Sequence, residues 1–215
     1  MGDHAAGEAR TVILARIRSA IGPAPPGSTL VRTYRTTLPA GIDVVERFIE
    51  RVGDYRAVVH RSSAAELPAV VARAFAARGV RRAVVPPGLP LEWLRGVPVE
   101  WLNDDPPLTK AQLDDADAVI TGCSVAIAET GTIVLTAGPA QGRRALTLLP
   151  DVHVCVVSAD QIVGDVPEAL ARLDGTRPLT WISGPSATSD IELNRIEGVH
   201  GPRKLDVIVV VPTQR

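Results

Sequence analysis

The chain has 215 residues, 46% of them hydrophobic, and its formal net charge at pH 7 is -1. This length fits one sizeable domain with a small appendage, and the hydrophobic content excludes a wholly disordered chain. A net charge near zero gives no overall field for nucleic acid or an anionic membrane, so neither is expected as a partner. The only two cysteines, Cys123 and Cys155, are too few for a conventional iron–sulfur cluster and lack zinc-ligand spacing, so no metal site is expected.

The amino-terminal segment has the pattern of a helix followed by a loop. Apolar side chains recur at helical spacing on one face: Ile13, Leu14, Ile17 and Ile21. Residues 1–40 are therefore expected to form a helical arm and loop that docks either on its own domain or on another subunit. The segment has no cationic leader, and no run approaches the roughly 18 apolar residues of a membrane span. A cytoplasmic protein without a membrane span is expected.

From residue 41 onward, helical and strand patterns alternate. Helices are expected at residues 44–52, 67–78, 91–94, from 110 and 166–173. Strands are expected at residues 57–59, 82–85, 97–102, 118–121, 132–136, 153–157, 179–183 and 205–211. Thr109 and Gln112 have the spacing of a capping box, and Pro98 favours an edge strand or a strand start. This alternation predicts a layered α/β domain over residues 41–215 with a mainly parallel sheet.

The first cluster that can carry chemistry is Glu129-Thr130-Gly131-Thr132, between two β-like runs. A glutamate at a strand end, beside a glycine that admits a close approach of backbone and ligand, is typical of a binding site. Glu129 can be a nucleophile, a general base or the salt-bridge partner of an arginine such as Arg143 or Arg144. The alternative is a structural carboxylate bonded to turn amides.

The second and third clusters follow near the carboxyl terminus. SGPSATSDIE contains six candidate ligand-binding residues: Ser183, Gly184, Ser186, Thr188, Asp190 and Glu192. Hydroxyls and turn amides of this kind can hold a phosphate or carboxylate, and Asp190 could cap a following helix. GVHGP places His200 beside Gly201, where the imidazole could transfer a proton near neutral pH. The alternatives are a hydroxyl-rich turn and a structural histidine. His153 and Cys123 are expected to be buried and inert.

These stretches together resemble the LUD-domain family, and within it most closely the lactate utilisation protein C group. The resemblance is carried by ADAVITGCSVAIAETGTIVL (116–135), LLPDVHVCVV (148–157), SGPSATSDIE (183–192) and GVHGP (198–202). ILARIR in the arm is also similar, so the resemblance extends over essentially the whole chain. It implies a fold like that of the ribose-phosphate isomerase, glucosamine-phosphate deaminase and coenzyme A transferase (NagB/RpiA/CoA transferase-like) superfamily.

The resemblance also implies a role in oxidising L-lactate to pyruvate within a three-protein system. Iron–sulfur clusters are then expected on the A- and B-type partner proteins, with no cofactor assigned to this chain. The expected contribution is a pocket for a small carboxylate or anionic cofactor, built from residues 129–132, 183–192, His200 and Gly201. In that pocket Glu129 and His200 are the catalytic candidates.

Two other functions stay open, one suggested by the Glu129 turn and one by the amino-terminal arm, which could contact a partner. The Glu129 turn is loosely similar to the acyl-acceptor turn of coenzyme A transferases, although Thr130 replaces the asparagine usual in some of them. A free-standing enzyme acting on acyl-coenzyme A or a sugar phosphate is therefore one alternative. A non-catalytic assembly subunit is the other. A homo-oligomer is compatible with all three.

Overall fold

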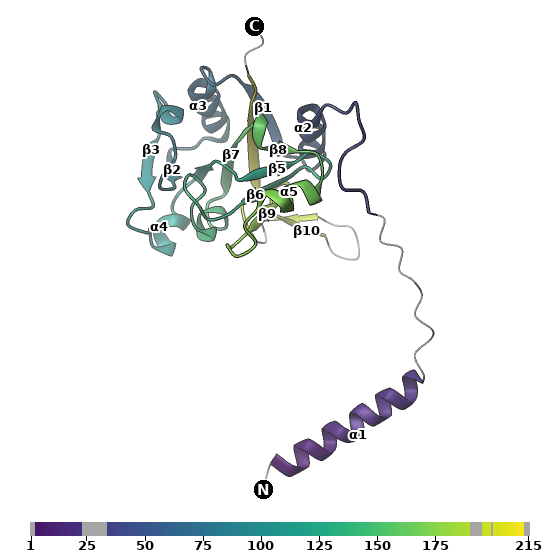
Figure 1. Ribbon diagram of the computed structural model, residues 1–215. Coiled ribbons are helices and arrows are strands. Elements are labelled where there is room, and N and C mark those ends of the chain that lie inside the picture. The colour runs from purple at the N-terminus through teal and green to yellow at the C-terminus, as the bar shows by residue number, and fades with distance from the viewer. Residues whose placement is uncertain (1–2, 23–33, 190–194, 199, 213–215) are drawn as a thin grey trace. The chain divides into compact units, whose positions relative to one another are not determined.

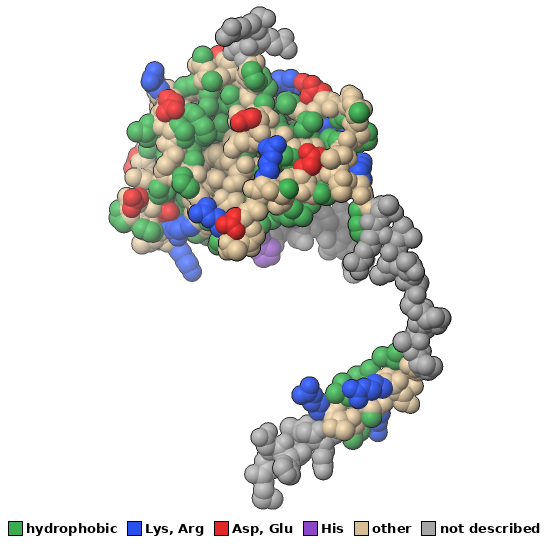
Figure 2. Space-filling model, viewed as in Figure 1, with side chains coloured by type: hydrophobic (Ala, Val, Ile, Leu, Met, Phe, Trp, Pro, Cys, Tyr) green, Lys and Arg blue, Asp and Glu red, His purple; other side chains and the backbone are tan. Residues whose placement is uncertain are grey.

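The structure, a computed structural model, describes residues 3–22, 34–189, 195–198 and 200–212. The chain divides into two units, residues 1–34 and 35–215. The first contains α1 (Asp3–Ile21), which confirms the helix predicted in the arm and ends at Gly22 with φ 68°. Both cationic and apolar side chains are visible on α1 (Figure 2). The docking of this helix stays a prediction.

The second unit is built on a six-stranded sheet in which every pair of neighbouring strands is parallel. This confirms the predicted fold class. In spatial order the strands are β1 (Val58–Ser62), β12 (Lys204–Val210), β7 (Val152–Ser158), β4 (Ala118–Thr121), β2 (Arg82–Val85) and β3 (Glu100–Asn103). The edge position predicted from Pro98 is also confirmed, since β3 is the outermost strand and begins after that proline.

A second sheet of four short strands packs beside the first. Its order is β8 (Ile162–Val163), β5 (Val125–Ile127), β6 (Thr132–Leu135) and β9 (Thr180–Ile182). Within it β6 is antiparallel to both β5 and β9. A separate antiparallel pair is formed by β10 (Ala187–Ser189) and β11 (Arg195–Glu197). The sequence did not reveal β5, β8, β10 or β11, because two or three residues are too few to show a period.

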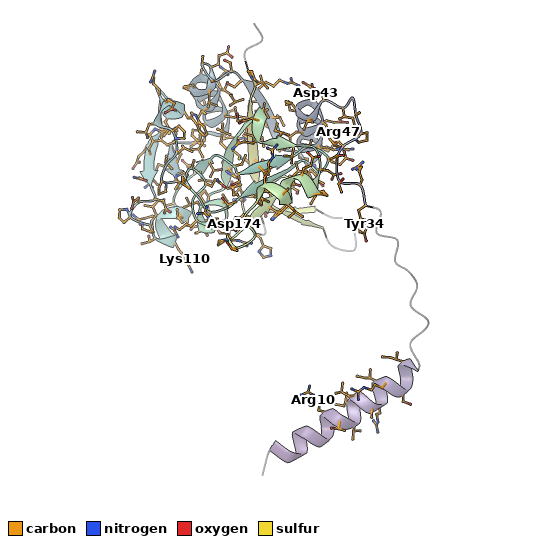
Figure 3. All side chains as sticks on the ribbon, in the orientation of Figure 1. Arg10, Tyr34, Asp43, Arg47, Lys110 and Asp174 are labelled. Carbon is orange, nitrogen blue, oxygen red and sulfur yellow. The ribbon has the colours of Figure 1, made fainter. Side chains whose placement is uncertain are left out.

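Helices pack against both the parallel sheet and the second sheet. They are α2 (Val44–Asp54), α3 (Leu67–Arg78), α4 (Lys110–Asp114) and α5 (Val166–Arg172), with 3-10 turns η1 (Leu91–Leu94), η2 (Arg144–Thr147) and η3 (Ala159–Gln161). The capping box at Thr109 is confirmed, and Asp43 caps α2 by accepting hydrogen bonds from two backbone amides (Figure 3). Both devices pair backbone donors that the first helical turn leaves free.

Alternate residues of the central strands pack into two different hydrophobic cores, one on each face of the sheet. On one face Val154, Val156 and Ile208 pack with Phe75 of α3. On the other face Cys155, Val157 and Val207 pack with α2 and the second sheet. Figure 1 accordingly shows α3 and α2 on opposite sides of β1. The near-continuous apolar runs of β7 and β12 therefore reflect burial on both faces, as parallel sheets require.

A buried charge cluster joins β1, β12 and α3. The carboxylate of Asp206 accepts hydrogen bonds from His60 Nε2 at 2.9 Å and Arg78 Nε at 2.8 Å. Asp206 is 2% exposed, so these partners offset the cost of burying its charge. No role was predicted for His60, which here joins the two neighbouring strands β1 and β12 through its hydrogen bond to Asp206.

Two surface properties complete the description. Acidic and basic side chains are interspersed on the face of the domain seen in Figure 2. Among the described helices, none combines the length and the hydropathy that a membrane crossing requires.

Candidate functional site

Glu129 lies in the turn of the β5–β6 hairpin, on the second sheet. It therefore does not lie at an end of the parallel strands, where the sequence had led us to expect a ligand. Gly131 has φ 58°, and a Cβ there would lie 2.7 Å from the Arg51 carbonyl carbon of α2. The glycine thus serves the packing of a helix against the hairpin.

The ion-pair partner of Glu129 is Arg35, whose Nη2 lies 3.3 Å from its Oε1. Arg35 also donates from Nε to Asp165 at 2.9 Å. Pairing of Glu129 with Arg143 or Arg144 was wrong. Arg143 instead binds both oxygens of the buried Asp104, each at 2.9 Å, because η2 places it beside the end of β3.

The loops SGPS and GVHGP, separated in the sequence, are hydrogen-bonded to each other. Ser186 N donates to Pro202 O at 2.8 Å, and Gly198 N donates to Ser186 O at 2.9 Å. His200 N donates to Ser186 Oγ at 3.0 Å. Gly184, with φ 82°, permits this arrangement, because a Cβ at that position would lie 2.4 Å from Tyr55 Cβ.

These loops line a pocket of about 250 Å³. It opens at the amino-terminal ends of β7 and β12, since GVHGP leads directly into β12 and Leu148 precedes β7. Figure 1 shows β10, in the same region, at the end of the domain away from the carboxyl terminus. The pocket brings together five of the predicted residues: Ser183, Gly184, Ser186, His200 and Gly201.

The remaining predicted residues lie elsewhere. Thr132 does not line the pocket but contacts a residue that does, because its Oγ1 and Ser183 Oγ share a hydrogen bond of 2.8 Å. Thr130 Oγ1 in turn shares a hydrogen bond of 2.7 Å with Thr132 Oγ1. Glu129 is not among the lining residues of the pocket. Thr188 belongs to β10, with its side chain outside the description, and Asp190 and Glu192 lie outside the described residues. The cap predicted for Asp190 falls on the same residues outside the description, directly after β10.

Arg144, Trp181 and His153 line the pocket without having been predicted. Among the described lining residues Arg144 brings a cation and none is acidic, so the pocket favours an anion. His153 is buried, and desolvation lowers its pKa to about 4, so it is neutral at pH 7. Its Nε2 shares a hydrogen bond of 2.8 Å with Thr121 Oγ1, which agrees with the satisfied core histidine expected. Nothing in the spacing of Arg144 distinguished it from its neighbour Arg143.

The two cysteines, Cys123 and Cys155, are both buried. Cys123 is 5% exposed, and contact with Cys155 together with burial raises the pKa of its thiol. Thiols in such surroundings are inert, as the sequence predicted. The described residues contain no group of three or more His, Cys, Asp or Glu arranged to hold a metal ion.

Residues 45–210 match the family model of the LUD domain. The chain belongs to the LUD domain family. The resemblance found in its motifs is therefore confirmed. The matched residues cover nearly the whole second unit.

One named relative extends the comparison to nearly the whole of the given chain. "Lactate utilization protein C" from Deinococcus radiodurans is 49% identical over 208 residues, which cover 94% of this chain and 96% of that protein. A protein of the same name from Shouchella clausii is 33% identical over 115 residues, half of each chain. A crystal structure of a DUF162 family protein from Deinococcus radiodurans, 49% identical, superposes with a TM-score of 0.67 over 78% of this chain and 96% of that one.

Proposed function

We propose that this LUD-family chain is a component of an L-lactate utilisation system and binds a small carboxylate in the pocket beneath GVHGP. The relatives named Lactate utilization protein C support the pathway. The observation that carries the ligand class is the lining of the pocket: the Arg144 cation, the Ser183 and Ser186 hydroxyls, and no acidic group among the described lining residues. Charge-assisted hydrogen bonds from a guanidinium suit a carboxylate.

The polar residues of the pocket bind different groups of the substrate. Arg144 pairs with the carboxylate of the substrate, and the serine hydroxyls contact its 2-hydroxyl or keto oxygen. The exposed His200 lies on the pocket wall, where its imidazole is the candidate for proton transfer with the substrate. Glu129 does not contact the substrate. The turn that contains it positions Thr132, whose hydroxyl is hydrogen-bonded to the Ser183 hydroxyl.

Oxidation of lactate to pyruvate releases two electrons and two protons. The two cysteines of this chain are too few for a conventional iron–sulfur cluster, so we assign the electrons to clusters on A- and B-type partner proteins. This chain then supplies substrate binding within a complex and lacks complete activity alone.

Deletion of the gene in the native host tests the pathway. Growth on L-lactate is expected to fail, growth on glucose to continue, and a plasmid copy to restore the first. An Arg144→Ala copy should restore growth poorly, whereas Arg81→Ala, at an exposed position outside the pocket, should match the original chain. Unimpaired growth of the deletion strain on L-lactate would refute the assignment.

A further inference from the structure

The parallel sheet has a second cavity at its opposite edge. The carboxyl ends of neighbouring strands surround it: Val210 ends β12, Ser158 ends β7, and Gly122 and Cys123 follow β4. Its volume is about 660 Å³, against about 250 Å³ for the carboxylate pocket. Open α/β sheets usually bind their ligands at this edge, because the loops after the strands diverge there.

The walls of this cavity are mainly apolar. Leu67 and Pro68 at the start of α3, Val156 of β7 and Val210 of β12 face the half-buried Trp93 of η1. The polar lining includes the side chain of Gln161, whose Nε2 donates a hydrogen bond to Cys123 O at 2.7 Å. An apolar pocket with an indole on its wall and few polar groups is suited to an aromatic ring.

The charges of this cavity differ from those of the carboxylate pocket. Two carboxylates, Glu92 and Asp160, and one guanidinium, Arg95, line it. Among these described residues negative charge is therefore in excess by one, which disfavours an anionic ligand. Along β7, His153 lines the carboxylate pocket and Val156 lines the cavity, three residues or about 10 Å further on, and no residue lines both, so the cavity is not an extension of the carboxylate pocket.

From these observations we propose that the cavity at the carboxyl edge is a second ligand site, which takes a planar aromatic molecule without negative charge and stacks it beside Trp93. The two sites bind their ligands independently. The site does not depend on the role in lactate utilisation, because its lining shares no residue with the carboxylate pocket.

The three tryptophans of the chain allow a direct test, because each lines a different pocket. Trp93 lines the proposed site, Trp181 the carboxylate pocket, and Trp101 a third cavity beside β3. Full-length protein labelled with 15N-tryptophan should give three indole signals, assigned by single Trp→Phe variants. The probe is 2-naphthol, and 2-naphthoate is the matched probe with the same rings and a negative charge.

Titration with 2-naphthol should shift the Trp93 signal saturably and leave the Trp181 signal in place, also when L-lactate is present. The naphthoate should bind about fivefold more weakly, because a single repelling charge acts through water-exposed carboxylates. A 2-naphthol shift confined to Trp101 or Trp181, or none at all, would overturn the proposal. Equal affinity for the two probes would overturn the exclusion of anions.

Two alanine substitutions separate site binding from general surface effects. Ala65 is exposed and lines the cavity mouth, whereas Ala40 is exposed in a turn outside it. Ala65→Phe should weaken 2-naphthol binding about tenfold by filling the mouth, and Ala40→Phe should leave it unchanged. Equal effects of both variants would contradict the placement of the site.

Discussion

His153 gives the fold a specific pH dependence. Burial lowers its pKa from 6.5 to about 4, so the native state does not take up a proton between these values, whereas the unfolded chain does. Proton uptake therefore favours unfolding as the pH falls from 6.5 towards 4. From these two pKa values the free energy of unfolding should be about 2 kcal/mol lower at pH 5 than at pH 7.5.

Urea unfolding at several pH values, followed by circular dichroism, measures this difference. His153→Gln, which cannot titrate, should be less stable at pH 7.5 but should lose most of the pH dependence above pH 5. His200→Gln is the matched control, because His200 is exposed, and its profile should follow that of the original chain. A slope between pH 7.5 and 5 that survives in His153→Gln would refute the reasoning.

Further substitutions test the packing around the site. Gly131→Ala should destabilise the fold by at least about 2 kcal/mol, because a Cβ meets the Arg51 backbone at a positive φ. Gly41→Ala, also at a positive φ but with nothing within 4 Å, should cost only about 1 kcal/mol in the same urea assay. Burial alone would raise the pKa of Asp104, but hydrogen bonds from Arg143 and from a backbone amide lower it. Asp104→Asn should therefore cost about 2 kcal/mol at pH 7, and less at pH 3, because below pH 3.8 the unfolded chain takes up a proton on this carboxylate before the native state does. A loss for Gly131→Ala no greater than for Gly41→Ala, or a pH-independent loss for Asp104→Asn, would contradict these contacts.

The main elements of the domain could be predicted from the sequence because their patterns are long or strongly capped. The apolar residues 205–211 indicated a central strand, and the spacing of Thr109 and Gln112 indicated the start of α4. The second sheet could not be predicted in full. Its strands β5 and β8 have three and two residues, so their pairing depends on long-range contacts that no local pattern encodes.

The candidate site was predictable in its loops but not in its surroundings. SGPS and GVHGP were singled out by composition, and the structure joins them around one pocket. Arg144 was not distinguishable from Arg143, because only the η2 turn decides which guanidinium reaches Asp104 and which lines the pocket. Gly131 was interpreted as a site for ligand approach, whereas the approaching group is the backbone of α2. A glycine in the sequence indicates that another group packs closely against the backbone, but it does not show whether that group is a ligand or another part of the chain.

Titration of the 15N-tryptophan-labelled protein with L-lactate tests the central claim, because Trp181 lies in the wall of the carboxylate pocket. A saturable shift of the Trp181 signal alone is expected. Arg144→Ala should weaken binding about tenfold, since it removes a charge-assisted hydrogen bond at an exposed rim. Arg81→Ala, at an exposed position outside both proposed sites, should leave the affinity unchanged. A Trp181 signal unmoved by L-lactate and pyruvate at millimolar concentrations would contradict carboxylate binding at this site.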